Sequence, residues 1–231
     1  MISKTIIIPC FNEINTISEI LKRVKENINE VDNIIIIDDG STDGTKELLS
    51  DINEKNIVTK FHEQNFGKGK AIQTALYEKL NDIIIIQDAD LEYNPKDYKQ
   101  LIKPFVEANA DVVYGSRFIG NNEYTRIHLF WHYIANKILT FICNIFTNLN
   151  MTDMETGYKC FRKETILDLK LKERSFGIEP EITIKLAKKK FVFYEVPISY
   201  AGRSYEEGKK IGLKDAFRAI YSIFKYSIFT K

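Results

Sequence analysis

Cysteine is scarce in this sequence and is not arranged for metal binding. The three cysteines, Cys10, Cys143 and Cys160, are widely spaced and form no CxxC pair, which excludes the usual zinc and redox motifs. The N-terminus also lacks the succession of basic region, long apolar stretch and small-residue cleavage site that is typical of a secretory leader. We therefore expect reduced cysteines and a cytoplasmic protein.

The 231 residues also carry little net charge and contain no repeat or low-complexity segment. The formal net charge is +1, with 44% hydrophobic and 28% charged residues, which is the composition of a globular protein with a sizeable core. From Lys185 onward, however, eleven Lys and Arg stand against four Asp and Glu. This excess fits an anionic partner or surface about as well as a solvated helix face, and no nucleic-acid partner is expected.

Short β-branched runs recur in the first half, separated by stretches with helical spacing. The runs are Thr5–Ile8, Asn33–Ile37, Ile57–Phe61 and Ile83–Ile86. Their alternation with helical segments predicts βαβ units. Because the isoleucines are consecutive, both faces of each strand should be covered, as in a parallel sheet flanked by helices.

Helices are expected between these strands. The first would run from about residue 15 to 28, the second would start at the turn 39–45, and the third would cover Lys68 to Leu80. The pattern is less regular in the second half. Two further strands are expected at Val112–Gly115 and Phe193–Ile198, and one long helix at 126–148.

Acidic residues follow three of the predicted strands. Glu13 comes soon after the first strand, Asp38 and Asp39 end the second, and Asp88 and Asp90 follow the fourth. Because ligands of open parallel sheets bind beyond the carboxyl ends of the strands, we expect these side chains to meet at one edge of the sheet.

The acids after the fourth strand predict a divalent cation. Asp88 and Asp90 are two residues apart in an extended segment, so their side chains point the same way, with Glu92 within reach. Clustered carboxylates repel one another, and a bound cation relieves that repulsion. No His or Cys lies close in sequence, so the oxygen ligands favour Mg2+ or Mn2+. The metal ligands expected are Asp88, Asp90 and Glu92.

Seven motifs in order cover the chain to about residue 215: IIIPCFNE, IIIIDDGSTDGT, NFGKGKAIQTAL, DADLEYNP, YGSRF, DMETGYKCFR and EVPISYAGRSYEEGKKIG. Together they resemble the family-2 glycosyltransferases, and within them the polyprenyl-phosphate or dolichyl-phosphate mannose and glucose synthases. The resemblance implies an α/β glycosyltransferase-A fold, with a Rossmann-like, mainly parallel sheet flanked by helices. It also implies a nucleotide-sugar donor, a divalent cation and inversion at the anomeric carbon. The family commonly has Gln where this chain has Glu92.

The resemblance places the donor site on the early motifs and on a late basic flap. Phe11 and Glu13 would frame the base and ribose. Lys68 stands at a glycine-rich approach to the nucleotide, or else at a solvated helix start, and Arg203 and Lys209 match a flap that closes over the pyrophosphate. The implied nucleotide-sugar-binding residues are Pro9, Phe11, Glu13, Asp38, Asp39, Lys68, Asp88, Ala89, Asp90, Arg203 and Lys209.

The nature of the acceptor is inferred from the charge of the side chains that would bind it. Transfer to a hydroxyl requires a general base, whereas a phosphate is already an anion at pH 7 and requires positive charge to bind. Arg117 and Arg126 correspond to the arginines that the lipid-phosphate branch uses. Asp153 is the base candidate for a hydroxyl acceptor, and Glu181 fits a family acid near the donor sugar better than Glu179. The implied catalytic residues are Asp90, Arg117, Arg126, Asp153 and Glu181.

Two segments predict contact with a membrane surface. The helix expected at 126–150 has a polar residue at every fourth position among large apolar ones. Since a spanning helix needs ~20 mostly apolar residues, this pattern favours an amphipathic interface helix, although a core or dimer helix looks similar. Residues 213–231 add a basic amphipathic helix without a transmembrane segment, suited to anionic headgroups. We expect a catalytic domain at 1–212 that is peripheral at the cytoplasmic face of a membrane. A homo-oligomer is possible.

The sequence thus predicts an inverting, metal-dependent glycosyltransferase that moves a hexose from a GDP- or UDP-linked sugar to polyprenyl or dolichyl phosphate. One alternative keeps the donor chemistry but transfers to a hydroxyl of a glycan or lipid. Another is a nucleotide-sugar-binding module without turnover, which the metal acids and Arg117 argue against. The Gln-x-x-Arg-Trp pattern of processive synthases is absent. The donor base, the sugar and the need for a partner subunit are not determined by the sequence.

Overall fold

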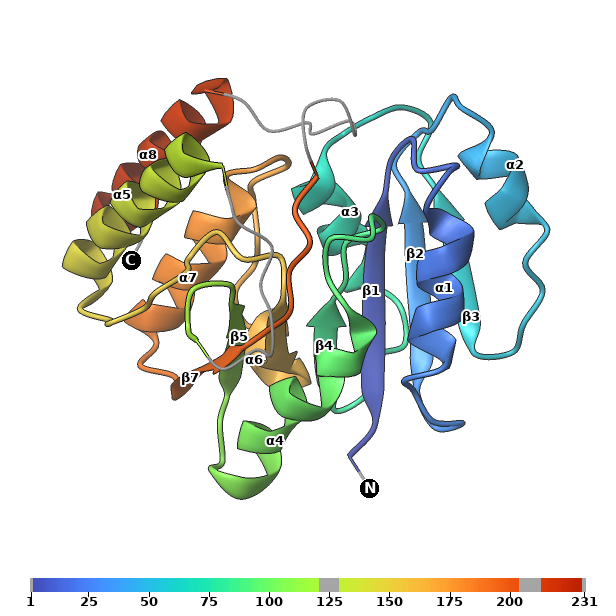
Figure 1. Cartoon of the computed structure of the whole chain (residues 1–231), viewed down its shortest axis with the longest axis horizontal. Coiled ribbons are helices and arrows are strands. Elements are labelled where there is room, and N and C mark those ends of the chain that lie inside the picture. The colour runs from blue at the N-terminus through green and yellow to red at the C-terminus, as the bar shows by residue number, and fades with distance from the viewer. Residues whose placement is uncertain (1, 121–128, 204–212, 230–231) are drawn as a thin grey trace.

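A seven-stranded sheet forms the centre of the molecule in a computed structural model that describes residues 2–120, 129–203 and 213–229 (Figure 1). The strand order is β3-β2-β1-β4-β6-β5-β7. β6 is antiparallel to both of its neighbours, and the other pairs are parallel, so the predicted, mainly parallel sheet is confirmed. The strands are β1 (Lys4–Cys10), β2 (Asn33–Asp38), β3 (Ile57–Phe61), β4 (Ile83–Ile86), β5 (Val112–Ser116), β6 (Lys159–Arg162) and β7 (Phe193–Pro197).

Helices cover both faces of this sheet. They are α1 (Ile17–Lys25), α2 (Thr45–Ser50), α3 (Lys68–Ala75), α4 (Tyr98–Glu107), α5 (Phe130–Thr147), α6 (Lys163–Leu167), α7 (Ile178–Lys188) and α8 (Leu213–Ile228), with a short 3-10 helix at Pro95–Asp97. The predicted strands and the helices α1, α2, α3, α5 and α8 are present. α3 ends at Ala75 rather than near Leu80, and α4, α6 and β6 were not predicted.

Consecutive isoleucines build two separate cores. Because successive side chains of a strand point to opposite faces, Ile35 and Ile37 of β2 pack with α3 on one face, while Ile34 and Ile36 pack with α1 on the other. All four are fully buried. Burial on both faces holds the strand ends in place, and those ends carry the acids.

α5 and α8 lie side by side at the end of the molecule far from β3, over α7 (Figure 1). The polar stripe of α5 is turned inward, not toward solvent. Asn144 exchanges hydrogen bonds with the backbone of Met151, and the Thr140 hydroxyl accepts one from Met154 N. The stripe therefore supplies partners for the loop before β6, and the large apolar side chains of α5 are left on the outside.

Candidate active site

A cavity of about 700 Å3 opens at the carboxyl ends of β1, β2 and β4 and extends to α5 and α8. β1 and β4 are neighbours and β2 lies on the other side of β1, so the acids that follow them meet at one edge, as predicted. The predicted site residues that line the cavity are Pro9, Phe11, Glu13, Asp39, Lys68, Asp88, Ala89, Asp90, Glu92, Arg117 and Arg203. Arg126 and Lys209 lie outside the described residues.

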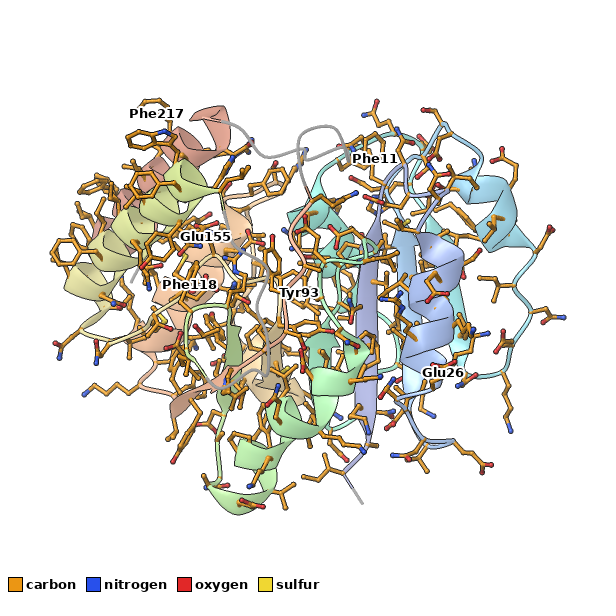
Figure 2. All side chains as sticks on the ribbon, viewed as in Figure 1. Phe11, Glu26, Tyr93, Phe118, Glu155 and Phe217 are labelled. Carbon is orange, nitrogen blue, oxygen red and sulfur yellow. The ribbon has the colours of Figure 1, made fainter. Side chains whose placement is uncertain are left out.

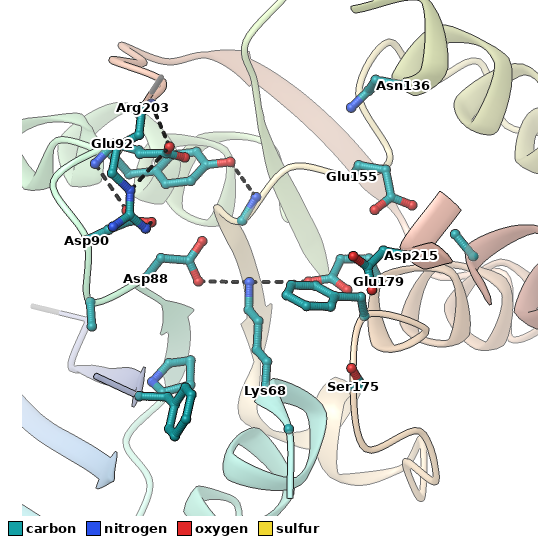
Figure 3. A pocket seen from close by; sticks show the side chains of 18 of the residues that line it. Lys68, Asp88, Asp90, Glu92, Asn136, Glu155, Ser175, Glu179, Arg203 and Asp215 are labelled. Carbon is teal, nitrogen blue, oxygen red and sulfur yellow. Dashed lines mark hydrogen bonds and ion pairs between the residues drawn. The ribbon is translucent and has the colours of Figure 1, made fainter. Parts of the chain in front are cut away.

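Two cations hold the acids that follow β4 (Figure 3). Lys68, the first residue of α3, places its Nζ 2.8 Å from Asp88 Oδ1 and 3.2 Å from Glu179 Oε1. Arg203 Nη2 lies 2.8 Å from Asp90 Oδ2, and Arg203 Nη1 lies 3.4 Å from Glu13 Oε2. Burial and the charge of Asp88 raise the pKa of Asp90 to about 7. Without these cations the acids would repel one another strongly.

Glu92 lines the cavity and contacts the segment after β7. Its Oε2 accepts a hydrogen bond from the Tyr200 hydroxyl at 2.8 Å, and its Oε1 accepts one from the Arg203 backbone N–H at 2.7 Å. Both carboxylate oxygens are thereby engaged with the segment after β7. These contacts hold the segment that carries Arg203 beside Asp90, and the role of Glu92 as a metal ligand stays a prediction.

Asp38 and Asp39, at the end of β2, take different positions. Only Asp39 lines the cavity. Asp39 accepts hydrogen bonds from the backbone N–H groups of Phe66 and Gly67, at 2.6 Å for Gly67. Gly67 has φ 98°, and a Cβ there would collide with the Arg174 carbonyl, so only glycine suits this turn. Asp39 thus orients the loop that leads into Lys68. Asp38 is fully buried and does not line the cavity, so the structure does not bring it together with the other predicted donor-site residues.

Arg117 and Asp153 form a bidentate ion pair. Arg117 Nε and Nη2 each lie 2.7 Å from an Asp153 oxygen, and Asn136 Nδ2 donates to Oδ1 at 3.1 Å. Asp153 is fully buried. Although burial acts in the opposite direction, Arg117 lowers the pKa of Asp153. Asp153 does not itself line the cavity; it orients Arg117, which does. Its role as a base toward a hydroxyl acceptor stays a prediction.

Glu181 lies on a different side of α7 from the one that the resemblance implied. Its carboxylate accepts hydrogen bonds from the backbone N–H groups of Lys172 and Glu173 and pairs with Lys185 Nζ at 2.5 Å. Residues two apart on a helix point in nearly opposite directions. Glu181 therefore braces the preceding loop, and Glu179 is the acid of this helix that lines the cavity.

Other cavity residues were not predicted. Tyr93, Tyr200 and Glu155 line it, and Glu155 lies within the quoted motif DMETGYKCFR, where its orientation could not be read. Gly157 of the same motif packs so closely on Asp88 and Tyr93 that a Cβ would overlap both side chains. The loop before β6 thus forms one wall of the cavity directly beside Asp88.

Solved structures of glucosyl-3-phosphoglycerate synthase from Mycobacterium tuberculosis share this fold. The complex with Mn2+, UDP and glucosyl-3-phosphoglycerate matches with a TM-score of 0.73 over 98% of this chain and 80% of that one, at 18% sequence identity. The fold is therefore that of the GT-A glycosyltransferases, as predicted. The sequence profile described as Glycosyl transferase family 2 matches residues 5–169, and the chain belongs to that family.

Archaeal proteins are similar in sequence. The UDP-N-acetylglucosamine--dolichyl-phosphate N-acetylglucosaminyltransferase of Methanococcus voltae is 28% identical over 237 residues, covering 94% of this chain and 93% of that protein. Glycosyltransferase AglJ of Haloferax volcanii is 30% identical over 201 residues, covering 86% of this chain and 63% of that longer protein. Membership of the family makes this chain a glycosyltransferase.

Proposed function

We propose that this enzyme transfers a hexose, with inversion, from a UDP- or GDP-linked sugar to polyprenyl or dolichyl phosphate. The course of the cavity carries the proposal: it runs from Phe11 and Asp90 at the strand ends to α5 and α8, whose outer faces are apolar. One end suits a nucleotide, and the other opens beside a surface suited to a lipid. The Methanococcus voltae relative, whose name states a dolichyl-phosphate acceptor, supports this choice.

Asp88 and Asp90 would hold the Mg2+ or Mn2+. Within the described residues, no group of three or more His, Cys, Asp or Glu side chains is arranged to hold a metal. Two carboxylates suffice where substrate phosphates and water complete the shell, as is usual for Mg2+. The bound cation would offset the charge that develops on the leaving diphosphate. Arg203, which contacts Asp90 Oδ2, lies where its guanidinium would also contact the donor phosphates.

Positive side chains divide between the two phosphate groups of the reaction. Lys68 and Arg203 lie at the β4 acids and would contact the donor diphosphate. Arg117, held by Asp153, would bind the acceptor phosphate, with Arg126 and Lys209 proposed for the acceptor and donor phosphates respectively. An acceptor that is already ionised needs no base. This agrees with the burial of Asp153.

One observation favours a hydroxyl acceptor as the second candidate. Glu179 is a carboxylate that lines the cavity, at the position where α7 begins, and a general base has to reach the reacting hydroxyl. If the acceptor is a hydroxyl of a glycan or lipid, Glu179 rather than Asp153 or Glu181 would take its proton.

A transfer assay tests the proposed function. With UDP-glucose, UDP-N-acetylglucosamine and GDP-mannose as donors, we expect sugar transfer to a short-chain polyprenyl phosphate and none to a free sugar. EDTA should lower the rate by about a hundredfold or more, because the leaving group loses its counter-charge, and Mn2+ should restore it. Transfer to the free sugar alone would establish the second candidate, and transfer unaffected by EDTA would contradict the metal site.

We also propose that α5 and α8 dock on a lipid surface. Across the described ranges, no helix is long and apolar enough to cross a bilayer. The outer faces of the two helices nevertheless expose large apolar side chains, with Phe217 at the outer edge (Figure 2). They are Phe130, Trp131, Tyr133, Ile138, Phe141, Ile145, Phe146, Phe217, Tyr221, Phe224 and Ile228. The cavity reaches the same two helices, so a lipid phosphate in the bilayer would have direct access to it.

Apolar insertion, more than charge, should drive this docking. Arg218 and Lys225 of α8 both contact the Glu173 carboxylate, which leaves less basic charge for anionic headgroups than the sequence predicted. In vesicle sedimentation we therefore expect binding to neutral phosphatidylcholine that persists at about 1 M salt, where screening is nearly complete. Phe141→Glu should abolish the binding, whereas Val106→Glu, at an exposed site on α4, should not.

Two outcomes would contradict membrane docking. If Phe141→Glu sedimented with vesicles as the wild type does, the outer face of α5 would not be the contact surface. If the wild type did not bind vesicles but formed dimers that Phe141→Glu dissociates, the outer face of α5 would be an interface between two copies of the chain. Analytical ultracentrifugation without lipid separates these cases.

A further inference from the structure

Beyond Lys68 the cavity contains a polar lobe that the proposed contacts to phosphate leave unassigned. Glu155 enters it from the loop before β6, and Glu179 from the first turn of α7. Figure 3 shows the Glu155 carboxyl turned toward Glu179 and Asp215 across this space. Asn136 and Ser175 line the same lobe.

Two buried oxygen atoms in this lobe have no hydrogen-bond partner among the described residues. They are Glu155 Oε1 and Glu179 Oε2, both shielded from solvent, and Glu179 as a whole is only 6% exposed. A buried polar group left without a partner destabilises the folded state. Most buried polar atoms are satisfied in native proteins. Two such atoms facing one cavity indicate a ligand that brings hydrogen-bond donors.

The two acids offer different hydrogen-bonding groups. Burial and the charge of Glu179 raise the pKa of Glu155, which favours the protonated carboxyl group, with an O–H donor and a carbonyl acceptor. Glu179 is paired with Lys68 at 3.2 Å and presents an acceptor. A sugar hydroxyl is itself both donor and acceptor. The lobe therefore matches neighbouring hydroxyl groups better than it matches an anion.

The position of the lobe fits the sugar of the donor. Phe11 and Gly67 line the cavity on the nucleotide side of Lys68, and Lys68 bridges Asp88 and Glu179. A diphosphate held at Asp88 and Lys68 has its nucleoside on one side and its sugar on the other. The sugar then lies against Glu155 and Glu179. Toward α5 and α8 the lining also includes apolar side chains such as Leu139 and Ala219, which suit the acceptor lipid, although His132 and Asp215 lie on the same helices.

We propose that Glu155 determines which sugar the enzyme accepts, by hydrogen bonds from its carboxyl group to hydroxyl groups of the transferred hexose beside Glu179. This inference rests on the proposed function, because it assumes a nucleotide-sugar donor at Asp88. It assigns to the loop before β6 a part in reading the sugar as well as in holding Arg117 through Asp153.

Donor discrimination by Glu155→Ala and Glu155→Gln tests the proposal. For the wild type and each variant, we would measure kcat/KM with UDP-glucose, UDP-galactose and UDP-N-acetylglucosamine, and the Kd of UDP alone with Mn2+. Glu155→Ala should lower kcat/KM for the preferred donor by about tenfold to a hundredfold and flatten the preference among donors. The Kd of UDP should not change. Glu155→Gln, which also presents a donor and an acceptor, should retain most of the preference.

Thermal unfolding separates a binding role from a structural one. Because Glu155 Oε1 is buried without a partner, its removal should leave the melting temperature unchanged or raise it. Glu164→Ala, at an exposed acid on α6 away from the cavity, is the matched control and should leave donor preference and UDP affinity unchanged.

Several results would contradict the proposed role of Glu155. An equal loss for every donor, a change confined to the KM of polyprenyl phosphate, an unaltered donor preference or a marked drop in melting temperature would each overturn the role of Glu155. If the wild type itself bound UDP but no sugar nucleotide better than UDP, the sugar lobe would be overturned while the nucleotide site stood. If the wild type bound no nucleotide at all, both the sugar lobe and the proposed function would be contradicted.

Discussion

Asp90→Asn is expected to lower sugar transfer by about a thousandfold or more while leaving the chain folded. Asparagine keeps the shape of the side chain but removes the charge that a divalent cation needs, and the loss of charge stabilisation at a leaving group is among the largest single effects in catalysis. Asp90 is partly buried beside Asp88 and Glu92, and burial together with the charge of these neighbours raises its pKa, so removing its charge should leave the melting temperature unchanged or raise it. Isothermal titration with Mn2+ and UDP should show loss of metal-dependent nucleotide binding.

Glu92→Gln is the matched control for this prediction. The amide oxygen of glutamine can still accept a hydrogen bond from the Tyr200 hydroxyl or the Arg203 N–H, and neither contact involves the metal. We expect its Mn2+ affinity to stay within a few-fold of the wild type. Asp90→Asn with full activity would remove the metal from the mechanism, and a Glu92→Gln variant as impaired as Asp90→Asn would show that Glu92 is a ligand.

Arg117→Ala should lose both stability and transfer. The guanidinium makes two hydrogen bonds of 2.7 Å to Asp153, which is fully buried. Removing one partner of a buried pair leaves an uncompensated charge, which costs about 3–5 kcal/mol. Chemical denaturation should show this loss of unfolding free energy, and transfer to polyprenyl phosphate should fall below detection in the same preparation.

A double variant separates the two roles of Arg117. Arg117→Met combined with Asp153→Leu removes both charges and retains apolar volume, so much of the stability should return. Transfer should stay absent, because no cation remains for the acceptor phosphate, while the affinity for UDP and Mn2+ should be preserved. A stable double variant that transfers sugar at the wild-type rate would show that Arg117 serves the fold alone.

The parallel part of the fold could be predicted because its pattern is local. Runs such as Ile34–Ile37 can be buried only if both faces of the strand are covered, and both faces are. β6 has no such pattern: it is four residues long and pairs antiparallel with β4 and β5. The orientation of α5 was also beyond the sequence. Its polar stripe fits water and a polar loop equally well, and only packing against Met151 and Met154 decided between them.

The sequence predicted where the site lies, but not which side chains contact one another there. The strand ends bring Glu13, Asp39, Asp88 and Asp90 to one cavity because β1, β2 and β4 are neighbours. Which carboxylate faces a ligand depends on which partners already bind it. Glu181 was expected in the cavity and is instead held by the backbone of the preceding loop.

By itself the sequence determined the class of fold, the edge of the sheet where chemistry is placed, and the family, since each depends on residues adjacent along the chain. The tertiary structure decided the use of each acid. Arg117 meets Asp153 across 36 residues and Glu92 meets Tyr200 across 108. Hydrogen bonds over such separations form only when distant segments pack together, and no local pattern of side chains encodes them.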